Sequence, residues 1–309
     1  MGHCIIVSRT LILSTSKTFS STKGDSIGVW GVFVQNAAYA VVLPIYLIIH
    51  LSMSKTVSPN PSGLSVSLPL LQAIPMALAI GYVLPAVLMS LPAPSIISFQ
   101  RKQMYVAIWQ MFPVWVSLVH EGLTRMLRTL VYRETSKQPS DLPHSMSMDA
   151  LRILYIGLLI IAGIGQIATA TMMATSTFFP DLFSTNFQGI FKASKVFLPA
   201  AVSPAIKMPS IGSGAHMLLQ YDEAIGSLAM IIWSTVLFVD VNKKTRAPQK
   251  AVYQIVQAVT VFILTGPLGY ATACIWARDE VVWADQMEPI RGEESLDVKK
   301  NQLEVKAEL

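Results

Sequence analysis

Long apolar stretches recur along this chain, and they constrain its fold more than any other feature. A helix that crosses a bilayer needs about 20 mostly apolar residues. Six stretches reach or approach that length: residues 27–51, 70–91, 104–120, 153–173, 216–239 and 255–276. Only 13% of the residues are charged, roughly half the share in a soluble globular domain. We therefore expect an all-α fold, a polytopic transmembrane helical bundle of six to seven spans.

The seventh span is the open part of this prediction. Residues 187–206 are apolar, but Lys192, Lys195 and two prolines interrupt them. A lysine at the membrane centre costs roughly 3 kcal/mol. We therefore favour an interfacial helix or a re-entrant piece over a span. A β-barrel is excluded because the apolar runs are long and continuous rather than short and alternating.

The chain divides into three parts by composition. Residues 1–26 are rich in serine and threonine, which is typical of a flexible or targeting-like segment. Residues 27–277 form the transmembrane domain, and residues 278–309 form a polar C-terminal tail. The net charge of +5 is modest; it indicates loops near anionic lipid rather than nucleic-acid binding. Two cysteines are too few for a disulfide framework or a cysteine-based metal site.

Several sequence motifs of common enzymes are absent. The chain has no P-loop, no GxGxxG and no GxSxG, so nucleotide-driven pumping, dinucleotide chemistry and acyl hydrolysis have no support. The five histidines are not spaced as HExxH. An aspartate-rich DDxxD motif, which would hold magnesium and a diphosphate, is missing as well. We expect no metal site and no cofactor.

Polar residues inside the apolar runs are candidates for function, because polar groups in hydrocarbon are costly. Asn36, Tyr39 and His50 lie near one face of the first run. The simpler interpretation is that Asn36 bonds a neighbouring helix and that His50 lies at the membrane interface. In the third run, Glu121 is either a buried acid or the i, i+4 partner of Arg125.

The fifth run opens with the polar sequence Gln-Tyr-Asp-Glu at residues 220–223. Asp222 and Glu223 are open to two interpretations. They are acids in the first turn of a helix, favoured by its dipole, or one is a protonated acid that faces a cavity and donates a proton. Trp233 lies eleven residues beyond Asp222, which is three turns along the same helical face.

Aromatic residues in the same runs could line such a cavity. A proton donor above aromatic π-faces is the arrangement that a carbocation cascade requires. The candidate wall residues are Trp30, Tyr39, Tyr82, Trp109, Phe112, Trp115, Tyr221 and Trp233. Aromatic residues also gather at membrane interfaces, so this pattern by itself is weak.

Four stretches together carry a family resemblance. They are QNAAYAVVLPIYLIIHL (35–51), GYVLPAVLM (81–89), IWQMFPVW (108–115) and LLQYDEAIGSLAMIIW (218–233). In this order they resemble the fungal integral-membrane terpene cyclases of the ascofuranone and macrophorin pathway type. The resemblance covers most of residues 30–240.

The resemblance implies a metal-independent enzyme of secondary metabolism, in the endoplasmic reticulum membrane. Such an isomerase or lyase cyclises the farnesyl-type chain of a meroterpenoid precursor by protonating a terminal epoxide or alkene. Asp222 is then the first candidate for the acid, with Glu223 and Glu121 in reserve. Asn36, His50 and Gln110 would orient the acid or take the final proton. The substrate-binding set is Asn36, Tyr39, His50, Tyr82, Trp109, Gln110, Trp115, Tyr221 and Trp233.

The family resemblance also implies the binding partners, and two alternative functions stay open beside it. A hydrophobic prenylated small molecule and membrane lipid are the expected partners, other enzymes of the pathway are possible ones, and nucleic acid is not expected. A transporter or exporter of a small metabolite is the first alternative, because intramembrane polar groups and prolines suit discontinuous helices. A non-catalytic membrane scaffold is the second. The surroundings of Asp222 distinguish the three.

Overall fold

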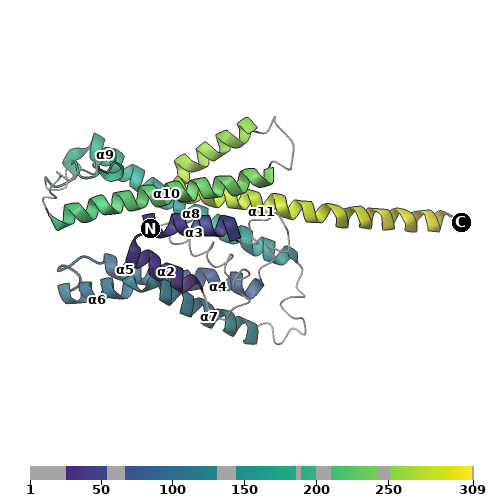
Figure 1. Cartoon of the computed structure of the whole chain (residues 1–309), viewed down its shortest axis with the longest axis horizontal. Coiled ribbons are helices and arrows are strands. Elements are labelled where there is room, and N and C mark those ends of the chain that lie inside the picture. Colours follow the sequence, from purple (N-terminus) through teal and green to yellow (C-terminus); the bar gives the residue numbers. More distant parts are fainter. Residues whose placement is uncertain are drawn as a thin grey trace.

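The structure, a computed structural model, describes residues 26–53, 67–130, 144–185, 189–199, 210–242 and 251–307. Within these ranges every regular element is a helix, which confirms the all-α prediction. The longer helices lie side by side as a bundle (Figure 1). In chain order they are α2 (Ser26–Ala37), α3 (Tyr39–Met53), α4 (Leu68–Leu78), π-helix η2 (Ala79–Val83), α5 (Leu84–Ser90), α6 (Phe99–Gln110), α7 (Phe112–Leu130), α8 (His144–Phe178), 3-10 helix η3 (Pro180–Leu182), α9 (Ala193–Phe197), α10 (Ile211–Asn242) and α11 (Ala251–Ala307).

Four helical stretches in the described part of the chain are long and apolar enough to cross a membrane. They are Leu68–Ser90, Met148–Phe178, Ile211–Val241 and Val256–Ala284. They match the second, fourth, fifth and sixth apolar runs of the sequence. The seventh segment contains α9, whose five residues are too short to span; residues 186–188 and 200–209 of this region lie outside the described residues, as do residues 1–25.

The first apolar run does not form one span, which corrects the prediction for residues 27–51. Ala38 has a φ of 70° and separates α2 from α3. A residue in the left-handed conformation interrupts the hydrogen-bond pattern of a helix. This conformation is sterically unfavourable for a residue with a Cβ, so tertiary contacts must stabilise Ala38 in it. Pro44 lies within α3. The two helices have 12 and 15 residues.

The third apolar run is also two helices rather than one span. Helices α6 and α7 meet at Met111, and Pro113 lies in the first turn of α7. Proline suits a first turn because its missing N–H would have no partner there. The Trp115 indole donates to the Ile108 carbonyl across the break, at 2.9 Å. The prediction of a span over 104–120 is therefore wrong.

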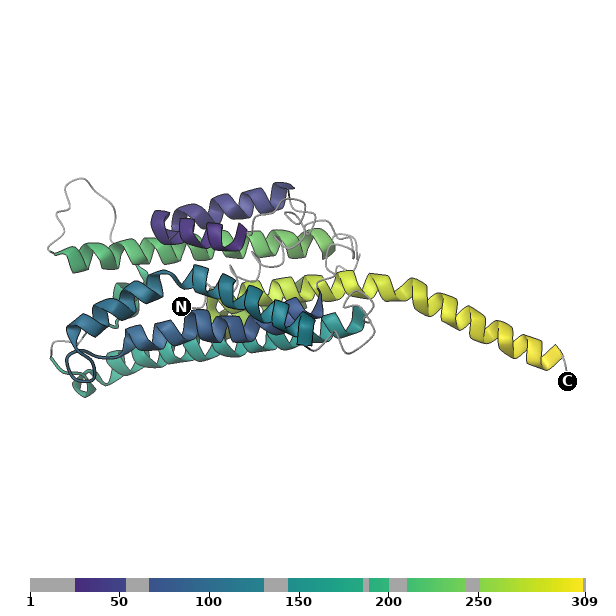
Figure 2. The ribbon, with the colours of Figure 1, turned by 90° about the horizontal axis from the view of Figure 1, so that it is seen from below.

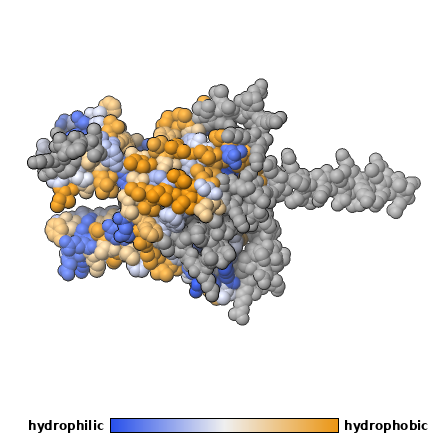
Figure 3. Space-filling view, viewed as in Figure 1, coloured by the Kyte–Doolittle hydropathy of each residue, from blue (hydrophilic) through white to orange (hydrophobic). Residues whose placement is uncertain are grey.

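The outer surface of the bundle is apolar, as expected for helices that face lipid. On α8, Ile153, Ile160, Ile164 and Ile167 are each more than half exposed. Hydrophobic residues gather over the middle of the helices, and hydrophilic residues mark the end that carries α6 and α9 (Figure 3). An apolar surface this large requires a non-aqueous environment or a partner.

Helix α11 bends back at Gly266, whose φ of 67° and ψ of −169° are not helical. Glycine adopts this conformation without steric cost, and Pro267 follows it. We call residues 251–265 the N-terminal leg and residues 267–307 the C-terminal leg. The C-terminal leg continues as a helix far beyond the bundle (Figures 1 and 2).

Within the described residues, buried side chains form two clusters, and Leu78 packs against both. The larger joins α3, α4, α8, α10 and α11, and its centre includes Leu43, Tyr155 and Met230. The smaller is formed by Tyr82 of η2 with Phe112 and Val116 of α7. The residues that the sequence singles out are divided between these clusters and the surface.

Candidate functional site

Asp222 lies in the interior of α10, eleven residues beyond its start at Ile211. The interpretation of Asp222 and Glu223 as acids in a first helical turn is therefore wrong, because α10 begins earlier than the sequence indicates. The predicted run began at residue 216 because apolar character rises there. The residues before it, rich in serine and glycine, are helical nonetheless. Asp222 is half-buried against a second helix.

The Asp222 carboxyl group caps the start of α3. Its Oδ1 accepts a hydrogen bond from the Ala40 backbone N–H, at 2.6 Å. The first N–H groups of a helix have no partner within the helix, and a side-chain oxygen commonly satisfies one of them. Here that oxygen comes from α10, 182 residues away in sequence. Asp222 Oδ2 has no hydrogen-bond partner within the described part of the chain.

Tyr39 packs one turn beyond Asp222 on the same face of α10. A Cβ added to Gly226 would lie 1.9 Å from Tyr39 Cε1. Only glycine leaves room for the ring at this point. Asp222 and Gly226 are four residues apart, so both face α3, as i, i+4 positions on one helix do.

His50 of α3 and Trp233 of α10 are in contact at the other end of the region where these two helices pack together. The Trp233 indole N–H donates to His50 Nδ1 at 3.3 Å, and the two rings are edge-to-face with centroids 5.4 Å apart. Tyr46 links His50 to Trp30 through ring contacts of 6.2 and 5.3 Å. Because Asp222 and Trp233 both contact α3, the prediction that they share one face of α10 is confirmed.

We define the α3/α10 interface as Tyr39, His50, Asp222, Gly226 and Trp233. The two helices lie next to each other along their length, on one side of the bundle (Figure 2). Three further predicted residues are close in sequence to interface residues: Tyr221 and Glu223 flank Asp222, and Asn36 precedes Tyr39 by three positions. Glu223 is exposed and accepts from the Ser227 hydroxyl, Tyr221 is half-buried, and exposed Asn36 bonds Val32 of its own helix.

The other predicted residues lie in or near the smaller cluster. Tyr82 and Trp109 each contact the Phe112 ring, with centroids 5.0 and 5.8 Å apart. Gln110 and Trp115 are exposed. Glu121 accepts from Arg125 at 2.6 Å on the surface of α7. The ion-pair interpretation of Glu121 is therefore confirmed, and that of a buried acid is wrong.

A buried polar cluster joins α8 to the C-terminal leg of α11, and sequence reasoning missed it. Arg278 and Asp279 are 4% and 2% exposed, and the Tyr155 hydroxyl donates to Asp279. Arg152 donates through Nε and Nη2 to both oxygens of Glu280, each at 2.7 Å. We call these five residues the α8/α11 polar cluster.

The sequence contains a signal for this cluster. Arg152 directly precedes the apolar run of α8, and the consecutive charges Arg278, Asp279 and Glu280 directly follow that of α11. Opposite charges at two span ends indicate pairing. The composition alone predicts a polar tail over residues 278–309. The structure buries the first two of these residues, and Val282 as well, within the bundle.

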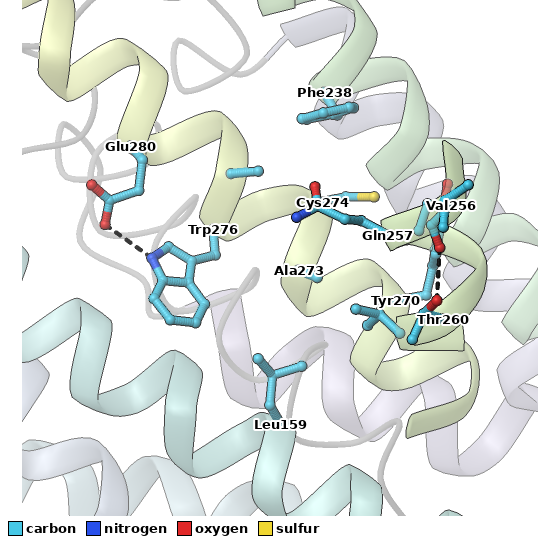
Figure 4. A pocket seen from close by; sticks show the side chains of 13 residues that line it. Leu159, Phe238, Val256, Gln257, Thr260, Tyr270, Ala273, Cys274, Trp276 and Glu280 are labelled. Atoms are coloured by element: carbon cyan, nitrogen blue, oxygen red, sulfur yellow. Dashed lines mark hydrogen bonds between the residues drawn. The ribbon is translucent and has the colours of Figure 1, made fainter. Parts of the chain in front are cut away.

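An apolar cavity of about 610 Å³ lies between α8, α10 and the two legs of α11 (Figure 4). None of the predicted site residues lines it. Its walls are Leu159, Phe238, Val256, Gln257, Ala258, Thr260, Val261, Tyr270, Ala273, Cys274, Trp276, Ala277 and Glu280.

The available chemistry is that of carboxyl groups and aromatic rings. In the ranges given above, no three His, Cys, Asp or Glu side chains are grouped as metal ligands. One carboxyl oxygen of Asp222 is available at the α3/α10 interface, whereas the carboxyls of the α8/α11 polar cluster are held by arginine and tyrosine. Asp222 therefore differs from the carboxyls of the α8/α11 polar cluster in having an oxygen without a hydrogen bond in the described part of the chain.

The chain belongs to the CtvD domain family, which matches residues 19–283. Curated relatives are fungal terpene cyclases, as the resemblance predicts. Terpene cyclase ascI of Acremonium egyptiacum is 29% identical over 83% of this chain and 63% of its own length. Terpene cyclase penA of Penicillium crustosum is 24% identical over 66% of this chain and 52% of its own length. Terpene cyclase ctvD of Aspergillus terreus is 22% identical over 80% of this chain and 65% of its own length.

The matched part is thus less than two thirds of the length of these three relatives. No solved structure matches the chain.

Proposed function

We propose that this chain is a membrane-bound, metal- and cofactor-independent terpene cyclase that closes rings in the prenyl chain of a meroterpenoid precursor. Membership of the CtvD domain family supports the class. The observation that carries the proposal is the setting of Asp222. One carboxyl oxygen is fixed by the Ala40 N–H at 2.6 Å, and the other is available. A general acid has to be positioned before it can transfer a proton well.

Asp222 would start the reaction in its protonated form. With Oδ1 accepting from Ala40, the acidic proton lies on Oδ2. Transfer to a terminal epoxide opens a C–O bond and leaves a hydroxyl group; transfer to a terminal alkene forms a C–H bond. Either step produces a carbocation, whose capture by the next alkene closes a ring. Loss of a proton from carbon ends the sequence, so the product is an isomer of the substrate.

The rings of the α3/α10 interface would stabilise the cation. Tyr39 packs beside Asp222, and Trp233 and His50 lie further along the interface. Aromatic faces attract cations by about 0.5–2 kcal/mol each. His50 would take the final proton at Nδ1, which accepts from the Trp233 N–H, so that hydrogen bond has to break first. Glu223 and Glu121 are less suited as acids because one is exposed and the other is paired with Arg125.

The test is expression in a fungal host, with location in the endoplasmic reticulum membrane checked by microscopy. Separate cultures receive farnesylated aromatic precursors with a terminal epoxide or a terminal alkene. We expect mass spectrometry to find a product of unchanged mass and shifted retention with one of them, absent with Asp222→Asn. A product that survives in Asp222→Asn would move the acid to Glu223 or Glu121.

The remaining outcome tests the alternatives. No isomer from either precursor, with the protein present in the membrane, would overturn cyclisation. Export of a labelled precursor would then identify a transporter. Loss of activity of another pathway enzyme on deletion would identify a scaffold.

A further inference from the structure

The cavity of α11 is separate from the α3/α10 interface. Phe238 is its wall on α10, and 16 positions separate it from Asp222. At 1.5 Å per residue this is about 24 Å along the helix. A molecule in the cavity is therefore bound away from the proposed acid.

The bend at Gly266 and small side chains keep the cavity open. The two legs of α11 diverge from Gly266. Ala258 of the N-terminal leg and Ala273 and Ala277 of the C-terminal leg all line the space, and Figure 4 shows Ala273 there. A volume of about 610 Å³ falls within the roughly 300–1,000 Å³ of small-molecule sites. The space is large enough for a chain-like ligand.

Trp276 forms a fixed aromatic wall of this cavity. Its ring stacks on Tyr155, with centroids 5.7 Å apart and planes 3° from parallel. Its indole N–H donates to Glu280 Oε1 at 2.9 Å, and Arg152 holds that carboxylate. Because stacking and hydrogen bonding fix the ring, rotation of Trp276 does not fill the cavity.

The lining is suited to a chain with a polar end. Leu159, Phe238, Val256 and Val261 give aliphatic and aromatic walls. The hydroxyl of Tyr270 is already bonded to Thr235, at 2.9 Å. Glu280, with 35% of its side chain exposed, lies close to the end of the candidate span Val256–Ala284. A chain can therefore lie in the cavity while its polar head stays near the membrane surface.

We propose that this cavity is a holding site for the prenyl chain of the amphipathic substrate, bound there away from Asp222. This inference rests on the proposed function. An acyl chain of a membrane lipid has the same apolar chemistry, so the experiment has to separate the two sources. The lining offers hydrocarbon walls and the ring of Trp276, which is a suitable surface for a branched, unsaturated chain.

Photolabelling of the full chain tests the proposal directly. The protein is placed in phosphatidylcholine nanodiscs with a farnesyl phenyl ether that carries a diazirine on its chain. We expect crosslinks in peptides that contain residues 256–261 or 273–277. An excess of unlabelled farnesyl phenyl ether should lower them by about ten-fold, and oleic acid should not. Equal competition by oleic acid, or no crosslinks in these peptides, would overturn the proposal.

A pair of adjacent substitutions sharpens the test. Ala258→Trp fills the cavity, whereas Val259 does not line it and is 52% exposed. We expect Ala258→Trp to lower labelling by about ten-fold and Val259→Trp to leave it unchanged. Ala277→Phe repeats the test from the other leg if Ala258→Trp does not accumulate. Equal labelling of the filled and control variants would contradict the assignment.

The same experiment distinguishes this inference from the proposed function. Asp222→Asn should lose turnover and keep labelling, because Asp222 does not line the cavity. Normal labelling of a wild-type protein that forms no cyclised product would overturn the proposed function alone. Turnover without labelling would overturn the holding site alone.

Discussion

The carboxyl groups of the α3/α10 interface and of the α8/α11 polar cluster differ in how many of their oxygens are bound by other groups. In the cluster, Glu280 is bound through both oxygens by Arg152, and buried Asp279 accepts from Tyr155 beside Arg278. At the interface, Asp222 has one hydrogen bond within the described part of the chain, from a backbone N–H. The carboxyls of the cluster, bound by arginine and tyrosine, connect α8 to α11. A carboxyl with an available oxygen can take part in chemistry.

The largest expected effect tests the interface. Asp222→Asn should lower the rate of cyclisation by about 10²–10⁴-fold, the usual contribution of a general acid. The amide oxygen still accepts from Ala40, so the melting temperature should change little. Product formation in isolated membranes and thermal unfolding in detergent measure the two effects. A large loss of stability with normal turnover per folded molecule would make Asp222 a helix cap only.

The next effect tests the cluster. Asp279→Leu should destabilise the protein by about 3–5 kcal/mol, because it leaves the buried charge of Arg278 without its neighbouring carboxylate. Asp149→Leu is the matched control. Asp149 also contacts an arginine, Arg152, but its side chain is 66% exposed. Denaturant unfolding of both variants should show a large loss only for Asp279→Leu. Similar losses would mean that the burial of the cluster does not matter.

A smaller effect tests how closely the interface is packed. Gly226→Ala should destabilise the protein by about 1–3 kcal/mol, as overpacking does, since its Cβ would meet Tyr39. Gly157 of α8 has nothing within 4 Å of an added Cβ. Gly157→Ala should therefore be neutral or stabilising, by up to about 1 kcal/mol. Thermal melting of the two variants compares them, and a neutral Gly226→Ala would show that Tyr39 has room to move.

The smallest effect lies outside both regions. Glu121→Gln should change stability by about 0.5 kcal/mol or less, because its pair with Arg125 is on the surface. Turnover should stay at the wild-type level, measured with the same precursor as for Asp222→Asn. A marked loss of turnover would instead return Glu121 to the list of candidate acids.

Apolar runs and helical periodicity determined a large part of the architecture. Hydrophobicity over about 20 residues is a local property, so the spans at 70–91, 153–173, 216–239 and 255–276 could be predicted without knowledge of the partners. The shared face of Asp222 and Trp233 follows from 3.6 residues per turn in the same way. The family resemblance rests on the same runs.

Only the tertiary structure decided where these helices break and what their polar groups contact. The left-handed residue Ala38 follows no sequence rule, and it places the start of α3 against Asp222. The hydrogen bond from Tyr155 to Asp279 joins residues 124 apart in sequence. The cavity depends on the angle between the two legs of α11, which Gly266 permits but packing against α8 and α10 sets. Contacts between distant segments depend on the whole arrangement of helices, which no local pattern contains.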